Sequence, residues 1–197
     1  MLVDPSGPKS SVVTALPGQH APVAGFDEPF ALLDACHERV RRSLALLQRL
    51  LAHVQSRGVD AHARTAAHDV LRYFSLAAPA HHEDEERHVL PLLRASGDAA
   101  LQALALRLLD DHAAIRQSWS LLAPHLQALN AGSAVDLETM RGAVAAFIAA
   151  HDGHLEREDA LAFPAAARLA AAQPGLVASI GNEMAVRRGV TPPQPGG

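Results

Sequence analysis

Apolar residues recur at steps of three and four along most of the chain, which is the spacing of one face of an α-helix. The first such run lies within the segment GFDEPFALLDACHERVRRSLALLQRLLAHVQSRG. Its apolar positions are Leu32, Leu33, Cys36, Val40, Leu44, Leu47, Leu50 and Leu51. Asp27 is placed to cap this helix at its start, and Gly58 is placed to end it.

The same pattern predicts three more long helices, over residues 60–95, 99–129 and 135–172. A Gly-Asp pair forms the turn after the second helix, NAGS closes the third, and QPG closes the fourth. Pro79 falls inside the second helix and should bend it or break it locally. A short fifth helix is expected over LVASIGNEMAVRR.

Four long helices joined by short connections predict an all-α protein built as an up-down-up-down four-helix bundle. The bundle would span residues 26–172, with the short C-terminal helix and a tail at 173–197. Residues 1–25 are rich in Pro, Gly and Ser and lack a helical period, so we expect an irregular, flexible N-terminal arm there.

Composition and charge exclude several classes of function. Apolar residues make up 49% of the chain and are mostly Ala and Leu, which favour helices. The net charge is −4 and no basic stripe is visible, so we expect no nucleic-acid partner. The single cysteine, Cys36, excludes a disulfide framework and a thiolate metal site. No apolar run reaches the ~20 residues of a membrane span, and the N-terminus lacks signal-peptide features, so we expect a cytoplasmic protein.

An internal repeat relates the second predicted helix to the fourth. Both carry the pattern Phe-x6-His-x3-Glu-x5-Pro, formed by Phe74, His81, Glu85 and Pro91 and again by Phe147, His154, Glu158 and Pro164. The first and third helices share His-x2-(Val/Ile)-Arg, which begins at His37 and at His112. The chain therefore reads as two helical hairpins of one design, each supplying a lone histidine and then a His-x3-Glu pair.

Helix geometry explains this spacing, because residues four apart lie on one face, one turn from each other. His81 with Glu85 can thus aim at the same point in the bundle interior as His154 with Glu158. Three aromatic residues share that inner stripe at seven-residue offsets and are expected to form an apolar wall: Phe74, Phe147 and Trp119.

His82 and Glu86 also fit His-x3-Glu, but only the His81 register matches the second copy in its Phe and Pro offsets. Because His82 and Glu86 lie about 100° further round the helix, we expect them to face solvent or a neighbouring helix. We place His151 beside the site rather than among its ligands. The remaining histidines of the predicted helices are expected on the surface or in packing: His53, His62, His68, His88 and His125.

Four imidazoles and two carboxylates buried together are costly without partners, and a pair of divalent cations would resolve that cost. Mixed imidazole and carboxylate ligands suit iron, manganese or zinc. Six ligands are too many for one tetrahedral zinc and too few to saturate two octahedral ions. Such a site would keep open positions for water, an oxo group or a small ligand, which indicates reactivity.

These segments resemble the hemerythrin-like (HHE cation-binding) domain family, bacterial di-iron type. The resemblance covers residues 25–170 and rests on FDEPFALLDACHERV, AAPAHHEDEERHVLP and HLEREDALAFP, in the order His, His-x3-Glu, His, His-x3-Glu. It implies two non-haem iron ions joined by an oxo or hydroxo group, with zinc or manganese as substitutes. By this resemblance His37, His81, His112 and His154 would be terminal ligands, and Glu85 and Glu158 would bridge the ions.

One departure bears on function. Oxygen-carrying members of the family have a fifth histidine on the third helix, whereas here Leu108 and Arg116 stand four residues from His112. The site should therefore be more symmetric, which resembles the bacterial proteins linked to nitric oxide stress and iron–sulfur repair. Asp111 and Glu38, which are next to ligand histidines, are candidates for orienting ligands or moving protons, although solvent exposure is the alternative.

The main hypothesis is a non-enzymatic di-iron protein that binds O2, NO or peroxide in oxidative or nitrosative stress, with a signalling protein or electron donor as partner. An oxidoreductase that reduces NO or peroxide or oxidises ferrous iron is the second. Metal handling, as iron donation, iron storage or a zinc-filled scaffold, is the third, and a helical interaction module is the fourth. A ferritin-like site would need Glu-x-x-His on two helices, and Leu161 stands where the second histidine would be.

Overall fold

The computed structural model describes residues 25–191 of the chain. Its α-helices are α1 (Pro29–Arg57), α2 (Ala61–Arg72), α3 (Ala78–Asp84), α4 (Leu90–Ala95), α5 (Ala99–Asn130), α6 (Leu137–His151), α7 (His154–Arg157), α8 (Phe163–Ala171) and α9 (Leu176–Arg187). Most of the predicted N-terminal arm, and the tail at 192–197, lie outside the described residues.

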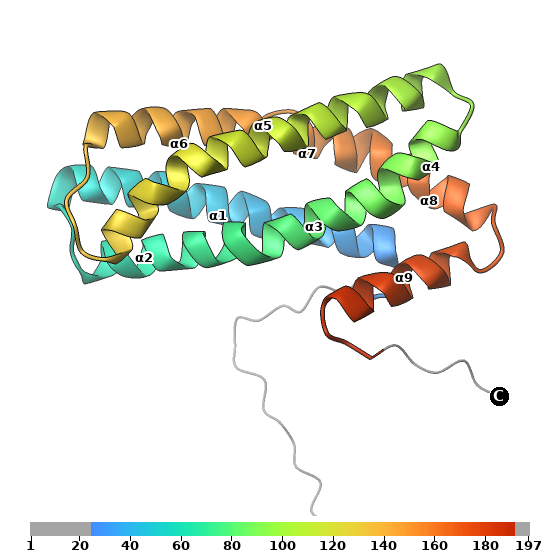
Figure 1. Ribbon diagram of the computed structural model, residues 1–197, viewed down its shortest axis with the longest axis horizontal. Coiled ribbons are helices and arrows are strands. Elements are labelled where there is room, and N and C mark those ends of the chain that lie inside the picture. Colours follow the sequence, from blue (N-terminus) through green and yellow to red (C-terminus); the bar gives the residue numbers. More distant parts are fainter. Residues whose placement is uncertain (1–24, 192–197) are drawn as a thin grey trace, which may run out of the picture.

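These helices form four long columns, as predicted (Figure 1). The columns are α1, then α2 to α4, then α5, then α6 to α8, and α9 packs alongside α1 and α8 near one end of the bundle. The described residues contain no β-strand, which confirms the prediction of an all-α four-helix bundle with a short C-terminal helix. Within the same residues, none of the helices has both the length and the apolar character needed to cross a membrane.

Turn residues set most of the helix boundaries. Gly58 ends α1 with a φ of 77°, and the side chains of Asp60 and Asp98 accept hydrogen bonds from backbone N–H groups at the starts of α2 and α5. The predicted cap at Asp27 is wrong: α1 starts at Pro29 after Glu28, and no side chain caps it. A proline in the first turn has no N–H that would need a cap.

The fourth column is not the continuous helix that the sequence predicted over 135–172. Asp152 ends α6 in an extended conformation, and Gly153 has a φ of 68° before α7 begins at His154. Glycine adopts this left-handed conformation at little cost because it has no Cβ. The break falls directly before one of the predicted ligands and sets the direction in which α7 leaves.

Three turns in the second and fourth columns are widened to π-helix: η1 (Tyr73–Ala77), η2 (Glu85–Val89) and η3 (Glu158–Ala162). The N–H that follows each segment donates to the carbonyl of the first residue of that segment, and the next residue is in every case a proline: Pro79, Pro91 or Pro164. A proline ring clashes with the carbonyl four residues before it in a regular α-helix. The widened turn relieves this clash, so the predicted disturbance at Pro79 is a π turn and not a break.

The hydrophobic core is divided into two clusters along the bundle axis. One contains Leu47, Phe74, Leu122 and Phe147, and the other contains Leu33, Leu93, Leu108, Phe163 and Met184. On every column the predicted metal ligands lie between these clusters in sequence, so a polar layer separates two apolar ones.

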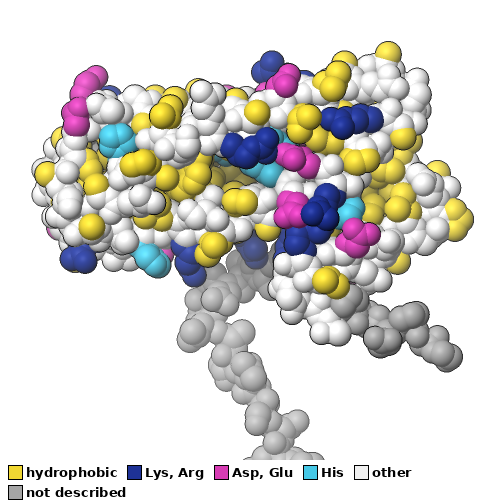
Figure 2. Space-filling view, viewed as in Figure 1, with side chains coloured by type: hydrophobic (Ala, Val, Ile, Leu, Met, Phe, Trp, Pro, Cys, Tyr) yellow, Lys and Arg dark blue, Asp and Glu magenta, His cyan; other side chains and the backbone are white. Residues whose placement is uncertain are grey.

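α9 covers the second cluster and is held by both packing and charge. Ile180 and Met184 are buried in that cluster. Arg187 and Arg188 pair with the fully buried Asp84 at 2.9 and 2.5 Å. On the face of the molecule seen in Figure 2, acidic and basic side chains lie beside one another, which agrees with pairing rather than with a field of one sign.

Candidate metal centre

All six predicted ligands lie inside the bundle at the level between the two core clusters. The exposed fraction is 0% for His37, Glu85 and His112, 1% for His154 and Glu158, and 3% for His81. The structure therefore brings together a histidine from α1, one from α5, and a His–Glu pair from each of the other two columns.

The two carboxylates face both hairpins at once. Glu85 Oε1 lies 3.0 Å from His81 Nε2 and 3.8 Å from His37 Nε2, while its Oε2 lies 3.4 Å from His112 Nε2. Glu158 Oε2 lies 3.1 Å from His154 Nε2 and 3.3 Å from His37 Nε2, while its Oε1 lies 3.6 Å from His112 Nε2. Each carboxylate thus faces imidazoles of both hairpins: Glu85 does so with different oxygens, whereas Oε2 of Glu158 lies near a histidine of each hairpin.

The side-chain atoms at the centre lack hydrogen-bond partners, although they lie close together. All four carboxylate oxygens of Glu85 and Glu158 are buried and unpaired, and so are the Nε2 atoms of His37, His81 and His112. Buried polar atoms in native proteins are nearly always satisfied. Imidazole nitrogens and carboxylate oxygens converging in this way fit a metal-ion site, since a cation would satisfy all of them.

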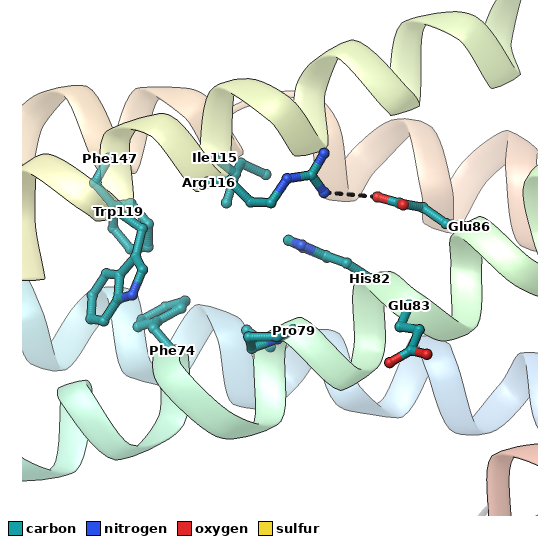
Figure 3. Close-up of a pocket in the computed structure, with 10 residues that line it drawn as sticks. Phe74, Pro79, His82, Glu83, Glu86, Ile115, Arg116, Trp119 and Phe147 are labelled. Carbon is teal, nitrogen blue, oxygen red and sulfur yellow. Dashed lines mark hydrogen bonds and ion pairs between the residues drawn. The ribbon is translucent and has the colours of Figure 1, made fainter. Parts of the chain in front are cut away.

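Two acidic residues outside this centre orient the lone histidines. His37 Nδ1 donates to Asp159 Oδ1 at 2.5 Å, and Arg41 donates to the other oxygen of Asp159. His112 Nδ1 donates to Glu86 Oε1 at 2.9 Å, and Arg116 donates to the same oxygen at 2.8 Å (Figure 3). Such a bond fixes which nitrogen of the ring faces the metal and how the ring is turned.

The His37–Asp159 and His112–Glu86 hydrogen bonds have the same arrangement, and each joins a residue of one hairpin to a residue of the other. Each acid directly follows the glutamate of one hairpin, and each arginine stands four residues after the lone histidine of the other. The sequence analysis missed Asp159 and did not assign Glu86 a partner. Two features shared by the repeats could have indicated these contacts: the arginine of His-x2-(Val/Ile)-Arg and the acid that follows each repeated glutamate.

His154 also has an acidic residue near its outer ring nitrogen. Asp111 Oδ2 lies 3.7 Å from His154 Nδ1 and accepts a hydrogen bond from Arg157 at 2.6 Å. Asp111 is only 7% exposed, so of the two adjacent acids it is the one that faces the site. Glu38 is exposed and pairs with Arg41.

The two carboxylates change the pKa values of the histidines around them. Burial lowers the pKa of His37 and of His112, but the nearby carboxylates of Glu158 and Glu85 favour the charged imidazolium, outweigh burial and raise these pKa values to about 9 and about 10. The pKa of His81 is also raised, because the charge of Glu85 overcomes burial, whereas burial keeps the pKa of His154 below its ordinary value. In the metal-free protein, therefore, imidazolium groups balance the two carboxylates.

The predicted aromatic wall is present beside the site. The rings of Phe74 and Phe147 meet edge to face with centroids 4.8 Å apart, and Trp119 lies 5.5 and 5.3 Å from them (Figure 3). His151 packs against both phenylalanines and donates from Nδ1 to the Phe147 carbonyl at 2.8 Å. Burial lowers the pKa of His151 to about 4, so it is a neutral part of this wall.

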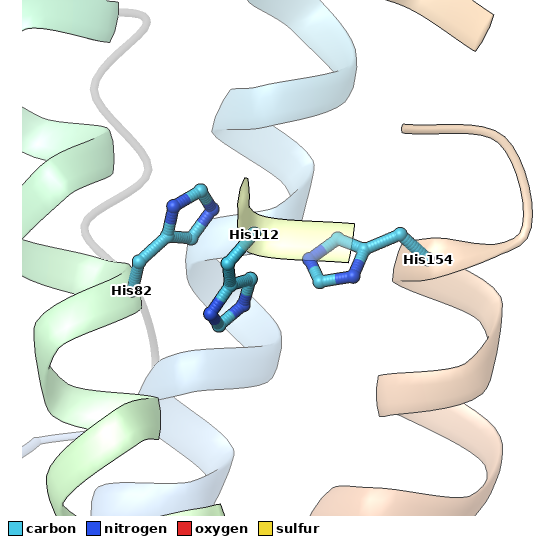
Figure 4. Close-up of side chains that lie close together, drawn as sticks. All are labelled: His82, His112 and His154. Atoms are coloured by element: carbon cyan, nitrogen blue, oxygen red, sulfur yellow. The ribbon is translucent and has the colours of Figure 1, made fainter. Parts of the chain in front are cut away.

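His82 faces α5 rather than open solvent. Its ring stacks on that of His112 with centroids 4.3 Å apart and planes 14° apart, and ligand atoms of His82, His112 and His154 lie within 4.8 Å of one another (Figure 4). An imidazole lone pair lies in the plane of its ring, so two nearly parallel stacked rings cannot both point at one ion. In this rotamer His82 is a neighbour of the centre and not a ligand.

The remaining histidines of the predicted helices lie away from the centre. His53 pairs with Asp60, and His88 is buried against Arg187 of α9. His62 and His68 are exposed and His125 is half-buried.

The chain matches one family model and one relative along most of its length. A model of the hemerythrin HHE cation-binding domain matches residues 28–172 of the chain. An uncharacterized protein of Haemophilus influenzae is 27% identical over 167 residues, which cover 85% of this chain and 94% of the relative.

Proposed function

Because this chain belongs to the hemerythrin HHE cation-binding domain family, we propose that its six buried ligands hold two non-haem iron ions. The observation that carries this proposal is the set of unpaired nitrogen and oxygen atoms that converge between the two core clusters. His37 and His81 would serve one ion and His112 and His154 the other, with Glu85 and Glu158 spanning both. Zinc or manganese could fill the same ligand set.

We further propose that the iron pair binds a small ligand, namely O2, NO or peroxide, in a response to oxidative or nitrosative stress. Iron would supply redox-active coordination positions beyond those that the six side chains fill. The protein's own part is to exclude water with the two apolar clusters and to hold the imidazoles in place through Asp159 and Glu86.

The bridging assignment is tested by removing both carboxylates in a Glu85→Ala, Glu158→Ala variant. We expect it to lose the two irons per chain that the wild-type protein would bind, measured by metal analysis after iron loading without a nickel column. The matched control is Glu83→Ala with Glu156→Ala, because these glutamates lie on the same two columns but are not buried. Stoichiometric iron in the double Glu85, Glu158 variant would refute the assignment.

Ligand binding is separated from catalysis by the behaviour of the iron-loaded protein with each gas. A reversible change in the visible spectrum, without consumption of ligand, supports a carrier or sensor that needs a signalling partner. Sustained loss of NO or peroxide in the presence of a reductant supports an oxidoreductase that needs an electron donor. Rapid loss of iron to a weak chelator supports metal handling.

A further inference from the structure

An apolar pocket lies between α3 and α5, beside the metal centre but outside its ligands. Its volume is about 200 Å³. Phe74 and Trp119 form one end, Pro79 and Ile115 form the sides, and His82 closes the other end (Figure 3). Ala78 also lines the pocket. The His82 side chain extends into the space between the two helices (Figure 3). One face of its ring stacks on the ring of His112.

The charged groups that line the pocket are already paired. Glu86 accepts a hydrogen bond from Arg116 at 2.8 Å, and Glu83 pairs with Arg87 at 2.7 Å. Since these charges are neutralised locally, the pocket offers a charged molecule no free counter-charge, and burying an unpaired charge there would be costly. The occupant that fits is therefore uncharged.

Size and lining define the occupant further. An engineered apolar cavity of about 150 Å³ binds benzene, so this pocket has room for one aromatic ring and a small substituent. The faces and edges of Phe74 and Trp119 suit an aromatic partner. The ring of His82 contacts the rings of other histidines, and its edge faces the pocket, where it can bond a polar end of the guest (Figure 3).

We propose that this pocket binds a neutral molecule of about the size of one aromatic ring, with its apolar body against Phe74 and Trp119 and its polar end at His82. This goes beyond the proposed function, because the site requires no metal. It also adjoins that function, since the occupant lies one stacked imidazole away from His112. The chain would then hold two different ligands side by side, a small ligand on the metals and a ring-sized molecule in the pocket.

The test uses phenol and benzene as probes, and the only tryptophan of the chain, Trp119, as reporter. Binding is followed in the full chain by Trp119 fluorescence and by NMR contacts between probe protons and the indole ring. Both probes should bind, and phenol should bind more tightly because its hydroxyl can bond His82. Measurements on metal-free and iron-loaded protein separate this site from the metal centre, because binding to the metal-free form is expected even if the iron proposal fails.

Two variants of matched chemistry locate the site. Ala78→Phe fills the pocket and should weaken benzene binding about tenfold or more. Ala77→Phe places the same ring on the exposed side of the same helical segment and should leave binding unchanged.

The proposal is overturned if neither probe binds up to its solubility, or if a folded Ala78→Phe protein binds benzene as well as wild type. If circular dichroism shows that Ala78→Phe does not fold, the NMR contacts decide. Contacts between benzene and Trp119 in the wild-type protein support the site, and benzene that binds without them refutes it.

Discussion

Two acidic side chains of different length orient the two lone histidines of the metal centre. Asp159 and Glu86 each accept a hydrogen bond from Nδ1 of a lone histidine, and each also accepts one from an arginine. The six inner residues were predictable because helical periodicity and the internal repeat both mark them. Asp159 was missed because its partners His37 and Arg41 lie 122 and 118 positions away on the other hairpin, so that only a comparison of the two repeats, and not helical spacing, indicates the contact.

We expect Asp159→Ala and Glu86→Ala each to weaken iron binding about 10- to 100-fold, since such outer partners orient metal-bound histidines. Competition with a coloured chelator measures this affinity. Asp110→Ala changes an exposed acid next to Asp111 and should leave the affinity unchanged. Equal affinities in all three variants and the wild type would show that Asp159 and Glu86 do not position the ligands.

Among the secondary-structure elements, the widened turns and the break at Gly153 were the features that sequence could not supply. The positions of the helices followed from apolar spacing and from residues such as Gly58 and Asp98. A proline within a helical pattern predicts disturbance, but whether it produces a bend, a break or a π turn depends on the packing of neighbouring columns. Because η2 and η3 begin at Glu85 and Glu158, the same local deformation lies at equivalent places in the two hairpins.

The docking of α9 depends on a glycine. A Cβ at Gly181 would lie 1.8 Å from the backbone oxygen of Phe26, so the helix approaches that backbone more closely than any side chain permits. We expect Gly181→Ala to force α9 away from the bundle and to lower the free energy of unfolding by about 1–3 kcal/mol, as overpacking does. Urea denaturation measures this.

Gly142→Ala is the matched control, because a Cβ there meets nothing within 4 Å in the exposed face of α6. It should stabilise the protein by up to about 1 kcal/mol through helix propensity. If Gly181→Ala were as stable as Gly142→Ala, the close packing of α9 would carry no energetic weight.

For the molecule as a whole, metal binding, protonation and stability are linked. In the metal-free state the pKa values of His37 and His112 are raised from 6.5 to about 9 and about 10. A raised pKa stabilises the folded state fully below the unfolded value of 6.5, and that contribution disappears as pH rises through 9 and 10. The metal-free protein should therefore become less stable between pH 7 and pH 10.

Iron acts in the opposite direction, because imidazoles must be deprotonated to bind it. We expect iron binding at pH 7 to release protons into weakly buffered solution, and the release to diminish towards pH 10. A pH indicator followed during anaerobic iron addition measures it, with the Glu85→Ala, Glu158→Ala variant as the control that should release none. Proton release that does not vary between pH 7 and pH 10 would contradict the raised pKa values.

The crossed hydrogen bonds make the two hairpins depend on each other. Each half lacks the acid that orients its own lone histidine and supplies the acid that the other half needs. Glu86 and Asp159 differ by one methylene, and a substitution of either acid changes the surroundings of a histidine on the other hairpin.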